Sequence, residues 1–390
     1  MSVAIDRDVA FLGMIRRIAD EVAAPNADDV DRNARFPAET IDALRAERAL
    51  SALIPGAYDG GDVSFETIAA ACFELGRRCG ASAMVFAMHQ IQIASIARHV
   101  DGAPWFQAYL RDVAREQRLV ASVTSEVGTG GDLGKSIAAV TPGDADEAMF
   151  EKRAPTVSYG AFADDLLTTL RRSPDAEPGD QVVVLTHRDQ FTLEQTSTWD
   201  PLGMRGTCSP GYLVRATFPK DQVLPTPFST VGAESMVPIS HILWSHLWLG
   251  IATDAFDRAR AFVRTSAKSR PDQLPPTAVR LSQLMSELSL LRAEVNTGLR
   301  DFSEATVGDR ERLSTMATIL RFNNLKIASS EQAPHVCQGA MSVCGIVGYK
   351  NDTPFSVGRH LRDTMSACLM VANERIHQTN ASLLLIAKDV

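Results

Sequence analysis

Thr198-Trp199-Asp200-Pro201-Leu202-Gly203-Met204-Arg205-Gly206-Thr207 is the most specific segment of this 390-residue chain. Short runs of β-branched and apolar residues lie on both sides of it, for example over 181–185 and 212–218. Such runs predict strands, and the Gly, Asp and Pro residues between them predict short connections. We therefore expect a β domain over roughly 118–228, with this segment inside it.

The regions on either side of the β domain have helical periodicity. Toward the N-terminus, apolar residues recur at helical spacing over 38–48 and 83–93, and Ser64 can cap a helix that starts near Phe65. Toward the C-terminus, long helical patterns are expected over about 277–305, 309–339 and 356–387. An order of helices, then strands, then helices predicts an α+β chain with segregated parts. The expected domains are 1–117 (α-helical), 118–228 (β) and 229–390 (helical bundle).

Composition excludes several classes of function. The formal net charge is −8 and no basic run is present, so we expect no nucleic-acid partner. No stretch approaches the ~18 apolar residues that a membrane helix needs, and the first residues do not form a secretory signal, so we expect no membrane insertion. The six cysteines are scattered without a CxxC pair. This pattern is typical of reduced thiols in a cytoplasmic protein without a metal site.

Two further segments in the middle of the chain carry glycines and small hydroxyl side chains. The segment 122–133, SVTSEVGTGGDL, runs from a strand into a Gly-rich turn. Backbone amides and hydroxyls in such a turn become available to the polar atoms of a flat heterocycle. The segment 153–161, RAPTVSYGA, contains a Thr-Val-Ser tripeptide that is typical of an edge strand. Each segment on its own is also typical of an ordinary turn or strand.

The C-terminal third contributes two more segments, the turn CGIVGY at 344–349 and RHLRDTMSACLMVANERI at 359–376. In order and spacing, all these segments resemble those of the acyl-CoA dehydrogenases over about residues 10–387. Segment 198–207 is similar to the family's Trp-Asp-x-Leu-Gly-Met-Arg-Gly-Thr at eight of its ten positions. The resemblance implies an α+β fold with an N-terminal helical domain, a central β domain and a C-terminal four-helix bundle. It also implies non-covalent FAD at a subunit interface of a homo-oligomer, either a dimer or a tetramer.

The same resemblance places the contacts to the cofactor. Ser125 stands where the family has the threonine of its flavin loop, and Ser158 keeps the hydroxyl that approaches the flavin. Thr156 replaces a tryptophan that lies against the flavin in the family, which should leave that edge roomier. Arg264 or Arg270 could contribute the arginine for the pyrophosphate. The complete set of expected cofactor residues is Val123, Thr124, Ser125, Gly130, Thr156, Val157, Ser158, Gly345, Gly348 and Asn373.

The family's catalytic base is missing from its usual position. Counting forward from Arg362, the place of the catalytic glutamate is held by Val371. An alternative position on the first helix of the C-terminal domain falls at Ser240, which is not a carboxylate either. Removing a proton beside a thioester carbonyl requires such a base. Two substitutes are considered: Glu374, on nearly the same helical face as Val371, and His241, whose neutral imidazole could act near pH 7. The remaining alternative, which we favour, is that no residue directly replaces the base.

Three hypotheses about function therefore stay open. The leading one is oxidation of the Cα–Cβ bond of an acyl thioester of CoA or a carrier protein, with an electron-transfer flavoprotein or oxygen as acceptor. The second is a monooxygenase of the same fold that uses reduced flavin. The third is a catalytically silent FAD-binding subunit that assembles with an active homologue.

Overall fold

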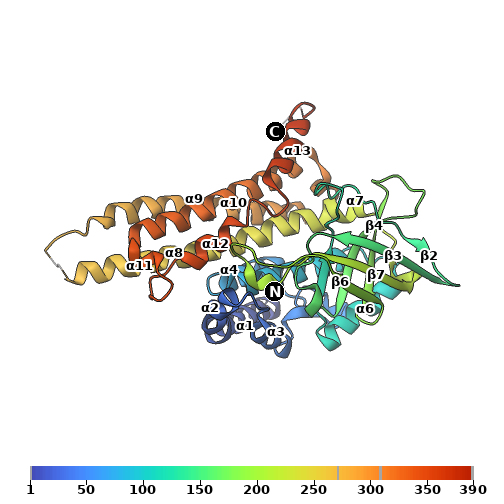
Figure 1. Cartoon of the computed structure of the whole chain (residues 1–390), viewed down its shortest axis with the longest axis horizontal. Coiled ribbons are helices and arrows are strands. Elements are labelled where there is room, and N and C mark those ends of the chain that lie inside the picture. Colours follow the sequence, from blue (N-terminus) through green and yellow to red (C-terminus); the bar gives the residue numbers. More distant parts are fainter. Residues whose placement is uncertain (1, 270–271, 307–309, 388–390) are drawn as a thin grey trace.

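The computed structural model describes residues 2–269, 272–306 and 310–387. Six helices form the N-terminal part, and two four-stranded sheets follow in the middle of the chain. The C-terminal part consists of long helices that extend away from the sheets (Figure 1). The predicted α+β class and its order of parts are confirmed. The predicted boundary at 228/229 falls within a short helix, and we keep both domain boundaries as a proposal.

The N-terminal helices pack around a core rich in Ala, Ile and Leu. Their bounds are α1 (Ser2–Ile18), α2 (Ala24–Arg32), α3 (Ala38–Ala46), α4 (Phe65–Gly76), α5 (Gly80–Ala97) and α6 (Pro104–Glu116). The predicted cap is present, because Ser64 accepts a hydrogen bond from the amide of Thr67 at the start of α4. Helix α5 is buried along nearly all of its length, since it lies between the other helices and the sheets.

The strands are β1 (Val120–Val123), β2 (Thr141–Pro142), β3 (Glu147–Ala154), β4 (Asp165–Arg171), β5 (Gln181–His187), β6 (Phe191–Gln195), β7 (Tyr212–Pro219) and β8 (Val223–Leu224). One sheet has the order β1-β4-β5-β8 and the other β2-β3-β7-β6. Strands β4 and β5 are buried on both faces, whereas β3 alternates between buried and exposed residues. Strand β1 pairs with β4 in parallel and lies at the edge of its sheet. An edge strand leaves half of its backbone groups free of the sheet.

The C-terminal part begins with α7 (Phe228–Val231) and a π-helical turn, Gly232–Met236. Helices α8 (Val237–Ser269), α9 (Thr277–Thr306) and α10 (Met316–Cys344) then pack side by side as the long helices of the bundle (Figure 1). Short α11 (Ile346–Tyr349) follows, and α12 (Gly358–Met365) and α13 (Asn373–Leu384) complete the chain.

The prediction of one continuous helix over about 356–387 is wrong. The helix ends at Met365, and a new helix starts at Asn373. Between them the backbone of Val371 has φ 46°, in the left-handed region. A β-branched residue in this region is an outlier, because its side chain crowds the backbone. Helical periodicity of the sequence does not reveal such a break, since the pattern on each side of it is helical.

Candidate functional site

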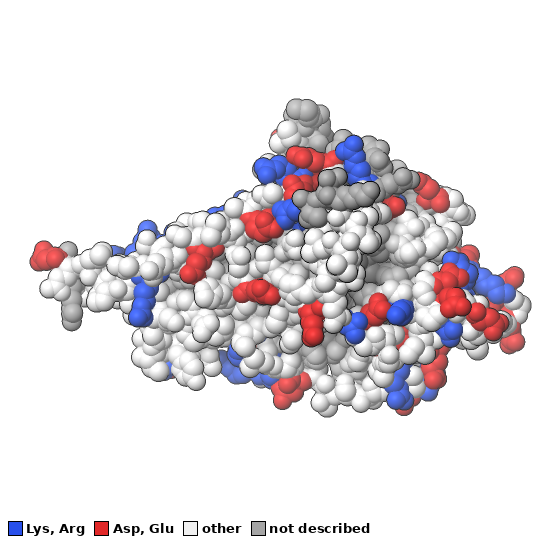
Figure 2. All heavy atoms as spheres, turned by 90° about the horizontal axis from the view of Figure 1, so that it is seen from above, with Lys and Arg blue, Asp and Glu red and all other residues white. Residues whose placement is uncertain are grey.

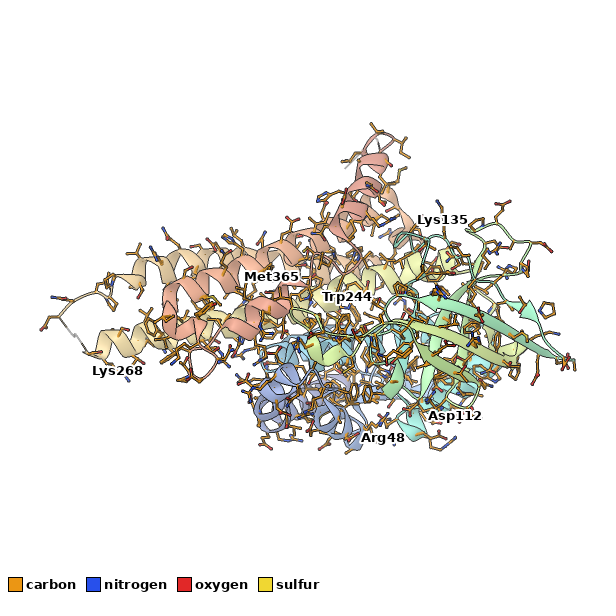
Figure 3. The ribbon with its side chains drawn as sticks, viewed as in Figure 1. Arg48, Asp112, Lys135, Trp244, Lys268 and Met365 are labelled. Carbon is orange, nitrogen blue, oxygen red and sulfur yellow. The ribbon has the colours of Figure 1, made fainter. Side chains whose placement is uncertain are left out.

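A cavity of about 620 Å³ lies where the three parts of the chain meet. Its walls come from α5, the β1 loop, the 198–207 segment, the start of α8 and the turn between α12 and α13. Figure 3 places Trp244 and Met365, which both line the cavity, near the centre of the molecule. Most of the lining is apolar, with methionines, Trp199 and Trp244 among it. A largely apolar cavity of this size with a few polar groups is typical of a small-molecule site.

The sheet side of the cavity brings together the two segments that the sequence singled out. Thr124, Ser125, Thr156 and Ser158 all line it. The Ser125 hydroxyl donates to the Thr156 carbonyl oxygen at 2.7 Å, so the two segments are tied directly to each other. Within the described chain, the amides of Thr124 and Ser125 donate no hydrogen bond. Because β1 is an edge strand, this wall offers free backbone donors to a ligand.

A chain of hydroxyls on the same side was missed by the sequence analysis. The Ser209 hydroxyl donates to Ser158 Oγ at 2.9 Å, and Thr207 Oγ1 lies 2.8 Å from Ser209 Oγ. Thr207 and Ser209 both line the cavity and are buried. The sequence analysis assigned no ligand contact to segment 198–207. Its last residue nevertheless belongs to the polar wall, because the chain turns back toward the sheet after Arg205–Thr207, a 3₁₀ turn.

The left-handed turn at Val371 forms the opposite wall. Asn373 holds this turn in place. Its backbone amide donates to the Cys368 carbonyl at 3.0 Å, and its side-chain oxygen accepts from Lys326 Nζ at 2.6 Å. The Asn373 side-chain nitrogen donates to Ser330 Oγ and to Glu331. Burial lowers the pKa of Lys326 to about 8. Strained backbone persists where surrounding contacts determine it in this way.

Replacing Asn373 with alanine is expected to destabilise the protein by about 2 kcal/mol, since the Lys326 ammonium group would be left buried without its acceptor. Urea unfolding at pH 7.5 measures this loss. Asn373→Asp is the matched control, because it keeps an acceptor for Lys326, and it should lose less. Equal stability of wild type and Asn373→Ala would contradict the role of Asn373 in holding the turn.

His241, one of the two candidate bases, lines the cavity and is 1% exposed. Burial, together with the positive charge of Lys326, lowers the pKa of His241 to about 3. The ring is therefore neutral at pH 7, and its Nδ1 lies 3.1 Å from the carbonyl oxygen of Phe322. A carbonyl can only accept, so Nδ1 carries the proton and Nε2 is left with a lone pair. In the described structure no hydrogen bond occupies Nε2.

Glu374, the other candidate, is exposed and is not part of the cavity lining. Its position three residues after Val371 gives it the same face only in a continuous helix, and the helix is broken there. Among the described lining residues, Asp132 is the one carboxylate, and it lies on the Gly-rich turn rather than on the bundle side. The bundle wall of the cavity thus presents Val371 and a neutral histidine to a ligand.

Several expected cofactor residues lie away from the cavity. Val123 and Val157 are fully buried in the core, and the Asn373 side chain is engaged by the bundle. Gly345 precedes α11 and Gly348 lies within it, and neither lines the cavity. Gly130 does line it, on the turn after β1. Arg264 is exposed near the far end of α8, and Arg270 lies outside the described residues.

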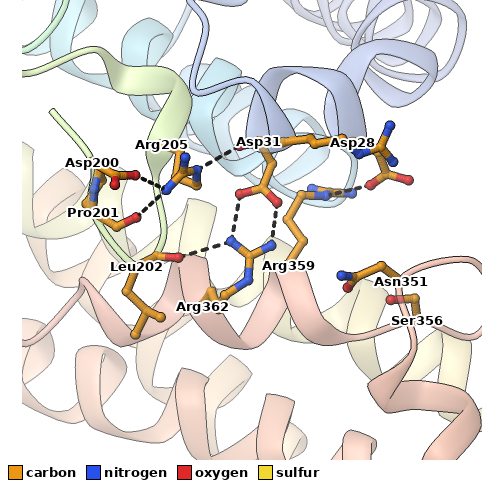
Figure 4. A pocket seen from close by; sticks show the side chains of 11 residues that line it. Asp28, Asp31, Asp200, Pro201, Leu202, Arg205, Asn351, Ser356, Arg359 and Arg362 are labelled. Carbon is orange, nitrogen blue, oxygen red and sulfur yellow. Dashed lines mark hydrogen bonds and ion pairs between the residues drawn. The ribbon is translucent and has the colours of Figure 1, made fainter.

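A second hollow, of about 470 Å³, adjoins the 198–207 segment (Figure 4). Arg362 on α12 makes a two-pronged ion pair with Asp31 on α2 and also donates to the Leu202 carbonyl. Arg205 donates to the Asp31 carbonyl at 2.9 Å, and Arg359 pairs with Asp28. These pairs fasten all three parts of the chain to each other beside the cavity. Two-pronged arginine–carboxylate pairs fix geometry as well as charge.

Over the described residues of the face in Figure 2, acidic and basic side chains are interspersed rather than gathered by sign. Among the helices of the described chain, none is long and apolar enough to cross a membrane.

Comparison with known proteins defines the class to which this architecture belongs. Residues 6–116 match the family model of the acyl-CoA dehydrogenase N-terminal domain. The probable acyl-CoA dehydrogenase YngJ of Bacillus subtilis is 24% identical over 90% of both chains. The family model covers the N-terminal domain, and together with the relatives it supports membership of the chain in the acyl-CoA dehydrogenase family.

Two other similar proteins are of a different functional type. The probable FMNH2-dependent monooxygenase SfnC of Pseudomonas putida is 26% identical over 67% of this chain and 63% of its own. Among solved structures, FMN-bound TdsC of Paenibacillus sp. A11-2, a dibenzothiophene monooxygenase, superposes with a TM-score of 0.82 at 19% identity, over 96% of both chains. The structural likeness supports the same fold.

Proposed function

We propose that this protein is a flavin-dependent monooxygenase that acts on an apolar, ring-containing substrate. The observation that carries the proposal is the bundle wall of the cavity, which presents Val371 and neutral His241 where dehydrogenation requires a carboxylate. The similarity to SfnC and to TdsC supports it. Aromatic and methionine side chains in the lining favour a flat apolar substrate.

The residues present fit a flavin. The free amides of Thr124 and Ser125 suit the heteroatoms of its ring system, and the hydroxyls of Ser158 and Ser209 lie on the same wall. A bound, reduced flavin would supply the two electrons with which one atom of O₂ enters the substrate and the other leaves as water. The apolar lining excludes bulk water from that chemistry.

His241 would orient the substrate. Its Nε2 lone pair can accept a hydrogen bond from a substrate hydroxyl or N–H. Because the Phe322 carbonyl fixes the proton on Nδ1, the acceptor is held in one tautomer. The pKa of about 3 keeps His241 neutral over the whole physiological range. Substrate binding through His241 should therefore be independent of pH between 5 and 8.

Dehydrogenation of an acyl thioester is the second candidate. The observation that favours it is the similarity of nearly the whole chain to YngJ. Under this hypothesis His241 would be the base. The expected cofactor would be FAD, the expected assembly a homo-oligomer, and the expected partner an electron-transfer flavoprotein. A neutral imidazole with a pKa near 3 is a weak base, which counts against this hypothesis.

An anaerobic titration separates the two reactions. Purified protein loaded with oxidised flavin is mixed with acyl-CoA thioesters of several chain lengths, and the flavin absorbance is followed. We expect no bleaching. With flavin reduced beforehand, ¹⁸O₂ and a panel of bicyclic aromatic compounds, we expect a product that contains one ¹⁸O atom. Bleaching by a thioester without any added reductant would refute the monooxygenase proposal.

His241→Ala tests the orienting role within the same assay. It should lower the yield of oxygenated product per reduced flavin at least tenfold while flavin binding changes by less than about twofold, since one acceptor to the substrate is lost. His335→Ala is the control, because His335 is exposed on α10 and does not line the cavity.

A further inference from the structure

Methionine is concentrated around the cavity. Six of the residues that line it are methionines, which is half of the twelve methionines in the chain. They lie on α5, on the 198–207 segment, on the π-helical turn before α8, at the end of α12 and in the turn that follows it: Met84, Met88, Met204, Met236, Met365 and Met370. The thioether of methionine is polarizable, packs well against aromatic rings and can be oxidised to a sulfoxide. Oxidisable sulfur therefore surrounds a cavity for which we propose chemistry with O₂.

Met365 is the most accessible of these six methionines. It is the last residue of α12 (Figure 3) and is 46% exposed, whereas three of the others are at most 7% exposed and two are half-buried. Leu369, in the following turn, also lines the cavity and is 75% exposed. The cavity therefore reaches solvent beside this turn. A small molecule that leaves the cavity on this side passes the Met365 side chain.

The same turn contains one other side chain that peroxides oxidise, Cys368. This cysteine is half-buried, and its thiol donates to the Met365 carbonyl oxygen at 3.6 Å. A cysteine reacts as the thiolate, so the proton held in this contact lowers its reactivity. A thioether needs no deprotonation before it reacts. Met365 is therefore the side chain of the turn that combines exposure with a ready electron pair.

We infer that Met365 is converted to methionine sulfoxide by hydrogen peroxide released in the cavity, and that this modification weakens the binding of apolar ligands there. The inference rests on the proposed function, because the peroxide is a by-product of the reaction between reduced flavin and O₂. It makes the protein sensitive to a supply of reduced flavin in the absence of substrate.

The electrons and atoms of this step balance. Without an organic substrate, O₂ takes two electrons and two protons from the reduced flavin and becomes hydrogen peroxide. A lone pair of the Met365 sulfur attacks one peroxide oxygen, the O–O bond breaks and an S–O bond forms. The second oxygen leaves as water. The sulfur is thus oxidised by two electrons, and the peroxide is reduced by two.

Oxidation changes the polarity of the cavity wall at this point. Methionine is apolar and adapts its shape to a ligand, whereas its sulfoxide carries a polar oxygen that forms hydrogen bonds with water. An apolar ligand that covers this oxygen removes it from water without replacing those hydrogen bonds. The oxidised protein should therefore bind apolar ligands more weakly than the reduced protein.

Isotope labelling tests where the peroxide is formed. The full-length protein is mixed with reduced FMN and ¹⁸O₂, without substrate and with catalase to remove peroxide from bulk solution. Trypsin releases residues 363–375 as one peptide, and fragment masses locate the ¹⁸O atom within it. Met285 and Met316 are matched controls, because they are 45% and 41% exposed and do not line the cavity. A second sample without flavin or catalase receives hydrogen peroxide and gives the intrinsic reactivity of each methionine.

We expect oxidation at Met365, relative to Met285 and Met316, to be at least about fivefold higher with reduced FMN and catalase than with added peroxide. Equal ratios in the two samples would show that the peroxide acts from bulk solution, and would overturn the inference. A product that contains ¹⁸O from an aromatic substrate, without label at Met365 when substrate is omitted, would overturn this inference alone. Failure of the protein to bind any flavin would overturn the proposed function as well.

A binding measurement without flavin tests the consequence of oxidation. The probe is N-phenyl-1-naphthylamine, a neutral apolar compound whose fluorescence rises in apolar surroundings. After peroxide treatment the dissociation constant of the wild type should rise roughly three- to tenfold. Met365→Leu, compared with its own untreated form, should change by less than about twofold, since leucine of similar volume cannot be oxidised. Met285→Leu should respond to peroxide as the wild type does.

Repair of the sulfoxide completes the test. Methionine sulfoxide reductases with dithiothreitol should restore the affinity of the treated wild type, because they reduce the sulfoxide back to the thioether. Equal losses of affinity in the wild type and Met365→Leu would overturn the role of Met365. Unchanged affinity of wild-type protein in which Met365 is fully oxidised would overturn it too.

Discussion

At pH 5.0 the protein is expected to be less stable than at pH 7.5 by several kcal/mol. Four histidines are buried in a neutral state, and burial lowers the pKa of each well below 6.5. The values are about 4 for His89, about 3 for His241, about 4 for His246 and about 4 for His360. In the unfolded chain the four histidines become protonated near pH 6.5. In the folded chain they become protonated only at about pH 4 or below. Stability therefore falls as the pH falls through this window.

Burial keeps these histidines neutral, and at His89 the hydrogen bonds fit a neutral ring. His89 Nε2 lies 2.7 Å from the Leu50 carbonyl, and its Nδ1 accepts from the Val120 amide, so the ring needs one proton and one lone pair. Each such histidine costs roughly 2 kcal/mol at pH 5.0, which gives at most about 8 kcal/mol for the four. Asp363 acts in the opposite direction, because burial raises its pKa to about 6, and it offsets roughly 1 kcal/mol.

Urea unfolding at the two pH values measures the difference. His246→Phe should reduce it by about 2 kcal/mol, because one neutral buried histidine is removed. His335→Ala, at an exposed site, should leave it unchanged. Free energies of unfolding that agree within 1 kcal/mol at pH 5.0 and 7.5 would show that the buried histidines do not control acid stability.

Within the 198–207 segment, Gly203→Ala is expected to be the glycine-to-alanine substitution that lowers stability most. A Cβ atom at Gly203 would lie 2.0 Å from the carbonyl oxygen of Arg362 and 2.6 Å from the amide of Asp363. Both neighbours are backbone atoms of α12, so no rotamer change can relieve the clash. The segment would have to move away from α12, which would break the hydrogen bond of 2.7 Å from the Met204 amide to Asp363. We expect a loss of about 3–5 kcal/mol.

The same substitution should also weaken flavin binding, since Gly203, Met204 and Arg362 all line the cavity. Thermal and urea unfolding, with flavin titration of the folded fraction, measure both effects. Gly13→Ala in α1 is the matched control: nothing lies within 4 Å of its added Cβ, so it should be neutral or slightly stabilising. Similar stability of the two alanine variants would contradict the close packing of the segment on α12.

Local sequence patterns predicted much of this fold because helix caps, helices and strands depend on interactions between residues that are close in the sequence. The cap at Ser64 follows from its residue type, and the long helix α9 follows from the periodicity over 277–305. The predicted strands over 181–185 and 212–218 lie within β5 and β7. The two segments with small hydroxyls also meet, at Ser125 and Thr156. By contrast, short β6 was missed, because its mixed polar residues lie on an exposed edge strand.

The sequence by itself indicated the acyl-CoA dehydrogenase family, and it determined the order of the helical and β parts and the absence of a glutamate at position 371. Each of these depends on residue identity and spacing along the chain. Only the tertiary structure decided that the last helix breaks at Val371, that Glu374 turns to solvent and that Arg375 lies against Gly130. Contacts distant in sequence cause these features. Lys326 holds the turn through Asn373, and the Gly-rich turn meets α13 across more than two hundred residues of chain.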